Sequence, residues 1–176
     1  AIIRPVRDQD SMELFAKDLD VISRLKTMTP ISFGGGIRSL HHLELLMDLP
    51  IERLVFSSSF IKKDERVIDQ AKNMFGHQAI QCLLPVKMVD GMIFVYESIN
   101  AEFVPLKSID VDAIDELANE VILYDVDNDG CRDGFNMYIP DGLQFVKSKL
   151  VITGGIGKST VKWAKREGLA SVLIDN

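Results

Sequence analysis

Two stretches of the chain share one pattern, PISFGGGIRS at residues 30–39 and LVITGGIGKS at residues 150–159. Each starts with a short apolar run containing β-branched residues, continues through adjacent glycines, and then has a hydroxyl residue that opens an amphipathic segment. This is the pattern of a buried strand that turns into a helix. Because the glycines expose backbone amides beside the start of a helix, each corner is predicted to bind an anion such as phosphate.

The spacing of this repeat predicts the fold. Strands are predicted near residues 31, 54, 80, 121, 150 and 172, with a further strand at Ile2-Ile3, and helical segments alternate with them. Such alternation is typical of an α/β protein with a parallel sheet and crossover helices. The two glycine turns lie about 120 residues apart, and a (β/α)₈ barrel needs roughly 250 residues. We therefore expect one barrel domain over residues 1–176 that lacks the first strand-helix unit and the last helix.

Individual elements follow from local periodicity and from helix-ending residues. Asp90-Gly91 between two apolar runs predicts a hairpin. Helices are expected at Asp18–Leu25, Leu40–Leu49, Ile109–Leu117, Leu143–Val146 and Val161–Arg166, and between a cap at Asp64 and Gly76. Strands are expected at Pro30–Phe33, Leu54–Phe56, Ala79–Leu84, Val121–Tyr124, Leu150–Thr153 and Ser171–Ile174.

Composition narrows the classes of function. The chain has no apolar run near the ~20 residues of a membrane span and no charged, apolar leader, which favours a cytoplasmic location. Its two cysteines, Cys82 and Cys131, lack metal-site spacing, so we expect no metal and no cofactor. The net charge of −6 argues against nucleic acid and anionic membranes as partners. A small phosphorylated ligand remains compatible, because amides and a few cations such as Arg38 or Lys158 can hold it.

Five motifs, in order and with reasonable spacing, resemble the cyclase subunit of imidazole glycerol phosphate synthase. They are Phe33–Ser39, Gly76-His77-Gln78, Val89-Asp90-Gly91, Val126–Gly134 and Gly154–Gly157, and the likeness runs from about residue 18 to the end. The sister family, the phosphoribosyl-formimino isomerase of histidine synthesis, is also similar. The Gly-His-Gln and Val-Asp-Gly motifs favour the cyclase.

The resemblance implies a two-fold symmetric (β/α)₈ barrel that takes a bisphosphorylated ribonucleotide, accepts ammonia from a glutaminase partner and closes an imidazole ring. Glu120 resembles an acidic residue of the family's ammonia gate. Carried onto this chain, one phosphate would lie at Gly35, Gly36, Ser58 and Ser59, and the other at Gly130, Gly154, Gly155, Gly157 and Asn176.

The catalytic acids of the family do not carry over. Ring closure needs a general acid and a general base, which the resemblance places on two aspartates of the first and fifth strands. The first strand is absent from this sequence, and Pro85 stands where the fifth-strand aspartate belongs, with Lys87 two positions on. Asp129 and Asp125 are the best remaining candidates, because the carboxyl end of a barrel strand faces the active side.

Each signal also has a purely structural interpretation. The glycines could serve tight strand-helix packing, Ser57–Ser59 could be a polar strand end, and the Asp-rich segment before Gly130 could be a capped turn. Three functions therefore stay open: a cyclase-like enzyme subunit, a catalytically impaired paralogue, and an isomerase of the sister type. The paralogue would be a glutaminase-binding scaffold or act in amidation of surface-polysaccharide sugars.

Overall fold

The computed structural model describes residues 1–6, 10–98 and 100–174. The chain forms two compact units, Ala1–Gln81 and Cys82–Asn176, and each is described by itself. The expectation of a single barrel domain over residues 1–176 stays a prediction.

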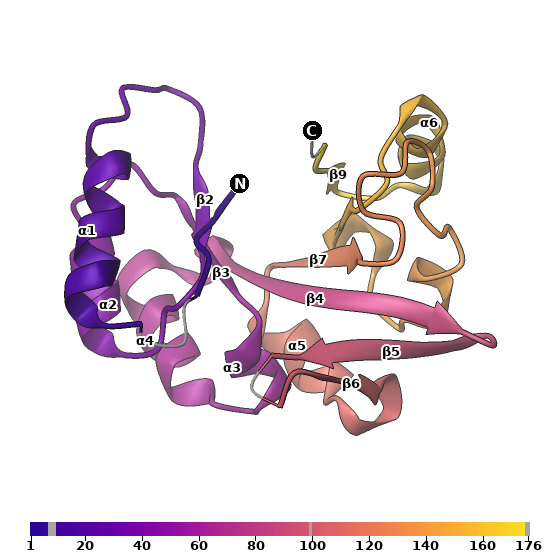
Figure 1. Ribbon diagram of the computed structural model, residues 1–176, viewed down its shortest axis with the longest axis horizontal. Helices are drawn as coiled ribbons and strands as arrows, with labels where there is room; N and C mark the ends of the chain where they lie inside the picture. Colours follow the sequence, from indigo (N-terminus) through magenta and orange to yellow (C-terminus); the bar gives the residue numbers. More distant parts are fainter. Residues whose placement is uncertain (7–9, 99, 175–176) are drawn as a thin grey trace. The chain divides into compact units, whose positions relative to one another are not determined.

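The first unit alternates parallel strands with helices. Strand β2 pairs in parallel with both β1 and β3, and in Figure 1 helices α1, α2 and α4 lie together on one side of β2 and β3. Phe15 and Leu19 of α1, Phe33 of β2 and Leu43 of α2 are buried between these layers. The elements are β1 (Ile2–Ile3), α1 (Met12–Ser23), β2 (Ser32–Gly34), α2 (Leu40–Leu46), β3 (Arg53–Phe56), α3 (Ser58–Ile61) and α4 (Glu65–Phe75).

The second unit combines an antiparallel ribbon with a parallel set of strands. Strand β4 (Ile80–Val89), which begins at the end of the first unit, pairs with β5 (Met92–Glu97), and β5 pairs with β6 (Glu102–Pro105). The ribbon of β4 and β5 ends in a tight turn (Figure 1). Strands β7, β8 and β9 are parallel. The remaining elements are α5 (Val111–Leu117), β7 (Glu120–Asp125), β8 (Leu150–Thr153), α6 (Lys158–Glu167) and β9 (Ser171–Val172).

Parallel strands joined by helices confirm the predicted α/β class, and they are the repeating unit of a (β/α)₈ barrel. The hairpin is also confirmed, since Asp90 and Gly91 both have positive φ in the turn between β4 and β5. Gly76 and Gly168 follow the last residues of α4 and α6, as glycines at helix ends do.

Two expectations about local structure are wrong. No helix forms at Leu143–Val146, because Leu143 and Phe145 are buried while Gln144 and Val146 are exposed, an alternation that an extended segment satisfies. The first helix begins at Met12 and not at Asp18, since the Ser11 hydroxyl accepts a hydrogen bond from the Leu14 amide and starts the helix earlier.

Candidate functional site

The turn after β8 packs directly on the end of β7, and this contact explains its glycines. Tyr124 pairs with Thr153, so the two strands end together. Gly154 has φ +86°, and a Cβ there would lie 2.2 Å from the carbonyl oxygen of Asp125. Gly155 has φ +78°, and its Cβ would lie 2.6 Å from the carbonyl oxygen of Asn128. Both positions therefore need glycine for backbone packing, whatever they bind.

A pocket of about 730 Å³ lies beside this turn. Three exposed cations, Arg132, Lys158 and Lys162, line it together with backbone of the glycine turn. Within the part of the chain that the structure describes, none of these three cations has an ion-pair partner. Their charge is therefore available to an anionic ligand. Of the glycines predicted to hold the second phosphate, Gly130, Gly155 and Gly157 line the pocket and Gly154 adjoins them, whereas Asn176 lies outside the described residues.

The start of α6 at this pocket is capped from another segment. Gly157 is the N-cap residue and has no side chain, so the helix needs an acceptor from elsewhere. The Oδ1 atom of Asp133 accepts hydrogen bonds from the amides of Ser159 (2.8 Å) and Thr160 (3.2 Å). These hydrogen bonds, the one from Thr160 first, lower the pKa of Asp133 below its usual range. Ser159, expected to open the helix, lies inside its first turn.

The two candidate catalytic carboxylates have different surroundings. Asp125 is buried, and its Oδ2 atom accepts hydrogen bonds from the Asn128 side-chain amide and the Asn136 backbone amide, both at 2.8 Å. It therefore fixes the loop that follows β7. Asp129 is exposed and accepts a hydrogen bond from the Tyr124 hydroxyl at 2.9 Å. Of the two, Asp129 is the one that a ligand can reach.

Three further residues of the prediction lie on β4 and β7. Glu120 is half-buried at the start of β7, the opposite end of that strand from Asp125. Pro85 lies half-buried in β4. The Lys87 ammonium group lies 3.9 Å from the centre of the Phe103 ring, a cation–π contact that holds it against β6.

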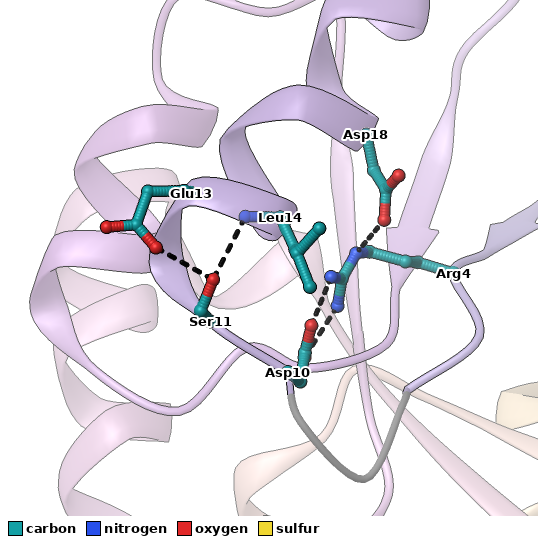
Figure 2. Close-up of polar contacts among 6 residues, drawn as sticks. All are labelled: Arg4, Asp10, Ser11, Glu13, Leu14 and Asp18. Carbon is teal, nitrogen blue, oxygen red and sulfur yellow. Dashed lines mark hydrogen bonds and ion pairs between the residues drawn. The ribbon is translucent and has the colours of Figure 1, made fainter.

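The first glycine corner is built around a buried arginine. A Cβ at Gly35, which has φ +102°, would lie 2.1 Å from the carbonyl oxygen of Arg4, and one at Gly36 would lie 2.8 Å from its Nη1 atom. The Arg4 guanidinium contacts Asp10 with both terminal nitrogens and donates from Nε to Asp18 at 2.8 Å (Figure 2). These two carboxylates balance a cation whose side chain is only 3% exposed.

The serines predicted to complete the first phosphate site begin a short helix instead of ending a strand. Ser58 and Ser59 are the first residues of α3, and Ser59 is buried. Because α3 has only four residues, it provides little helix dipole. In the neighbouring α2 the Ser39 hydroxyl is bonded to Nδ1 of His42 at 2.7 Å and does not cap the helix.

Sequence reasoning did not identify Asp133, Tyr124, Arg4 or Asp10 as parts of the two corners. The lack of a capping side chain at Gly157 was a visible signal that α6 needs an external acceptor. The acceptor itself lies 26 residues away from Ser159, and no local pattern identifies it. Arg4 likewise contacts partners that lie six and fourteen residues away in the sequence.

The described residues form neither a metal-binding cluster nor a membrane-spanning helix. Among residues 1–6, 10–98 and 100–174, no three His, Cys, Asp or Glu side chains come together in a group that could hold a metal ion. No helix in those same residues is both long and apolar enough to cross a bilayer.

Comparison with known proteins identifies subunits of imidazole glycerol phosphate synthase as relatives. Imidazole glycerol phosphate synthase subunit HisF of Campylobacter concisus is 27% identical over 146 residues, which make up 80% of this chain and 57% of that protein. The subunit HisF of Alkaliphilus metalliredigens is 27% identical over 174 residues, 89% of this chain and 69% of that protein. The subunit HisF of Helicobacter hepaticus is 29% identical over 133 residues, 73% of this chain and 52% of that protein.

These matches confirm the resemblance drawn from the glycine and Asp-rich motifs. The chain spans little more than half the length of two of these relatives. The model of the family described as "Histidine biosynthesis protein" matches residues 10–175, which is nearly the whole chain. The chain therefore belongs to the histidine biosynthesis protein family.

Proposed function

We propose that this protein is a cyclase-like subunit that uses ammonia from a glutaminase partner on a bisphosphorylated or nucleotide-linked substrate. The pocket beside the glycine turn of β8 carries this proposal. It offers backbone amides and three cations without acidic partners in the described residues, at the carboxyl ends of parallel strands where ligands of α/β proteins bind. Its ligand would therefore carry a phosphate group.

A second phosphate would lie at the first corner, on Gly35, Gly36, Ser58 and Ser59. The shared backbone geometry of the two corners supports this assignment.

Asp129 would move the protons of the reaction. It is exposed, so a substrate can reach its carboxylate, and the hydrogen bond that the Tyr124 hydroxyl donates to it would orient that carboxylate. Asp125 would act on the same site by holding the loop that carries Asp129. Glu120, at the far end of β7, would belong to the entry for ammonia from the glutaminase.

One observation favours a second function. Pro85 has no proton to exchange, and it stands where the resemblance places an aspartate. A paralogue without cyclase activity would bind the glutaminase as a scaffold, or deliver ammonia to another phosphorylated or nucleotide-linked acceptor, such as a surface-polysaccharide sugar. An isomerase of the sister type would also need an aspartate that has no counterpart here.

The test uses the full-length protein with a candidate glutaminase. Glutamine hydrolysis is measured with and without the protein, and then ammonium is supplied with the imidazole-pathway bisphosphate to detect the ring product. A cyclase gives both stimulated hydrolysis and product. Asp129→Asn should lower product formation by about a hundredfold, the lower bound for removing a general acid or base. Asp127→Asn, an exposed residue of the same loop, is the control.

Each outcome selects one function. Stimulated hydrolysis without ring product selects the scaffold or sugar-modifying paralogue. If Asp129→Asn forms as much product as Asp127→Asn, Asp129 is excluded as the acid or base. If the protein neither stimulates glutamine hydrolysis nor forms the ring product, the proposed function is ruled out in all its forms.

A further inference from the structure

The Asp133 carboxylate accepts hydrogen bonds from amides at the start of α6, a kind of group that also binds phosphate. Its Oδ1 atom accepts from the amides of Ser159 and Thr160 and lies 3.3 Å from the Thr160 hydroxyl. Amides in the first turn of a helix have no acceptor within the helix, and this is why anions bind there. The α6 helix is ten residues long, so its dipole adds to the attraction.

Gly157 is shaped for this carboxylate. A Cβ at Gly157 would lie 2.4 Å from Cγ of Asp133, so any other residue would push the side chain away. Gly157 also lines the pocket, and Asp133 therefore lies at the pocket's edge. This glycine, predicted to hold phosphate, makes room for an internal anion instead.

The carboxylate of Asp133 does not neutralise the three cations of the pocket. The accepting oxygen of Asp133 faces amides and a hydroxyl. Among the residues that the structure describes, Arg132, Lys158 and Lys162 have no ion-pair partner. An anion can therefore be attracted to the cations while α6 is still capped. It has to compete only for the helix amides.

We infer that the Asp133 carboxylate competes with a bound phosphate for the α6 amides. The phosphate binds first to the three cations and reaches the amides only by displacing this carboxylate. The inference rests on the proposed function, because it requires a phosphate group in the pocket. Displacement also releases the Asp133 end of the loop at residues 126–134 from α6, while Asp125 continues to hold the loop at Asn128 and Asn136. Asp133 thereby selects for ligands whose charge is high enough to replace it.

The experiment measures binding of inorganic phosphate by calorimetry to the full chain and three variants. Asp133→Asn removes the competing charge, and Asp127→Asn removes one charge from an exposed position of the same loop. We expect Asp133→Asn to bind phosphate about tenfold more tightly than Asp127→Asn, since hydrogen bonds to charged groups are the strong ones. Lys162→Met should weaken binding. In the wild-type protein, phosphate should shift the NMR signals of the Ser159 and Thr160 amides.

The outcomes separate this inference from the proposed function. Equal phosphate affinity of Asp133→Asn and Asp127→Asn, with binding weakened by Lys162→Met, overturns the competition and leaves the phosphate pocket intact. No phosphate binding by any form overturns the pocket itself. If Asp133→Asn does not fold, the wild-type NMR titration decides, because unchanged Ser159 and Thr160 amides at saturating phosphate contradict displacement.

Discussion

The two glycine corners have the same backbone geometry, but the buried side chains beside them differ in charge. At the first corner the missing Cβ of Gly35 faces the carbonyl oxygen of Arg4 at 2.1 Å, and at the second that of Gly154 faces the carbonyl oxygen of Asp125 at 2.2 Å. Arg4 and Asp125 thus have equivalent places, and both are buried. One is a cation and the other an anion, so the repeat preserves how two backbone segments touch and not the side chain beside them.

The partners of these two side chains follow from their charges. Arg4 has two carboxylates, Asp10 and Asp18, as a cation with a 3% exposed side chain requires. Asp125 accepts from two neutral amide donors. The first corner therefore depends on a balance of charge and the second on hydrogen bonds, and the two should respond differently to the same kinds of substitution.

The largest effect should come from the shared backbone. Gly35→Ala and Gly154→Ala should each lower the free energy of unfolding by about 4 kcal/mol, since a residue held at an unfavourable φ costs ~1–3 kcal/mol and forced overpacking a further ~1–3 kcal/mol. Urea unfolding of both variants measures the loss. If the corners are equivalent, the two losses agree within the error of the unfolding measurement.

Gly130→Ala is the matched control. Gly130 has φ +72°, but nothing lies within 4 Å of its Cβ position. It should therefore cost only the ~1–2 kcal/mol of the left-handed conformation. If Gly130→Ala loses as much unfolding free energy as Gly154→Ala, the positive φ alone, without the contact to β7, explains why these positions need glycine.

The next effect tests the charge balance of the first corner. Among the described residues, Asp10→Asn leaves the buried Arg4 guanidinium with Asp18 as its remaining carboxylate partner, and removing one member of a buried ion pair costs ~3–5 kcal/mol. Because Asp18 remains, we expect about 3 kcal/mol by urea unfolding. Asp20→Asn, which removes an exposed partner of Arg24, should cost less than about 0.5 kcal/mol. Equal losses would mean that Arg4 is solvated and needs no balance.

Much of the fold could be predicted because its signals are local. The β8 strand has the predicted bounds, Leu150–Thr153, since a continuous apolar run ending in glycines has one simple interpretation. The edge strand β6, by contrast, was missed. It has four residues, ends at Pro105 and is held by pairing with β5, including contact of Phe103 with Tyr96, which no local pattern reveals.

The candidate site was predictable only in its backbone. The glycines indicate where segments approach closely, and this is where both corners lie. The charges around them depend on tertiary contacts between a residue outside the helices and a helix distant in sequence, as with Arg4 and Asp18 of α1 or Asp133 and Ser159 of α6. Sequence spacing could not assign these pairs, because exposed acidic residues are common throughout an acidic chain and only the folded backbone selects among them.

A smaller effect tests the second corner by the same change. Asp125→Ala leaves the Asn128 and Asn136 amides without their acceptor and should cost about 2 kcal/mol by urea unfolding. Asp125→Asn should recover most of this loss, because an amide oxygen can accept the same two hydrogen bonds. The asparagine therefore rescues the second corner, whereas at Asp10 it does not. Failure of the rescue would show that charge matters at Asp125 as well.

The smallest effect is a difference in the pH at which each corner weakens. Burial, followed by the charge of Arg38, lowers the pKa of His42, whose ring makes an edge-to-face contact with Phe15 in the first unit. The unfolded chain then binds this proton more tightly, so the stabilisation is present above the ordinary histidine pKa and is lost as pH falls through the lower folded value. The pKa of Asp133 is lowered by the α6 hydrogen bonds, so its stabilisation is lost only below the ordinary pKa of 3.8.

Comparison of each variant with the wild-type protein across pH isolates the two contributions. The difference in unfolding free energy between the wild-type protein and His42→Phe should change between about pH 7 and pH 5, where an ordinary histidine titrates. The difference for Asp133→Asn should stay level there and shrink below about pH 4, where aspartate is protonated. Titration of Glu167 occurs in all three proteins and cancels. A change for Asp133→Asn between pH 7 and pH 5 would mean that the α6 cap responds to a histidine, and the two corners would then not titrate independently.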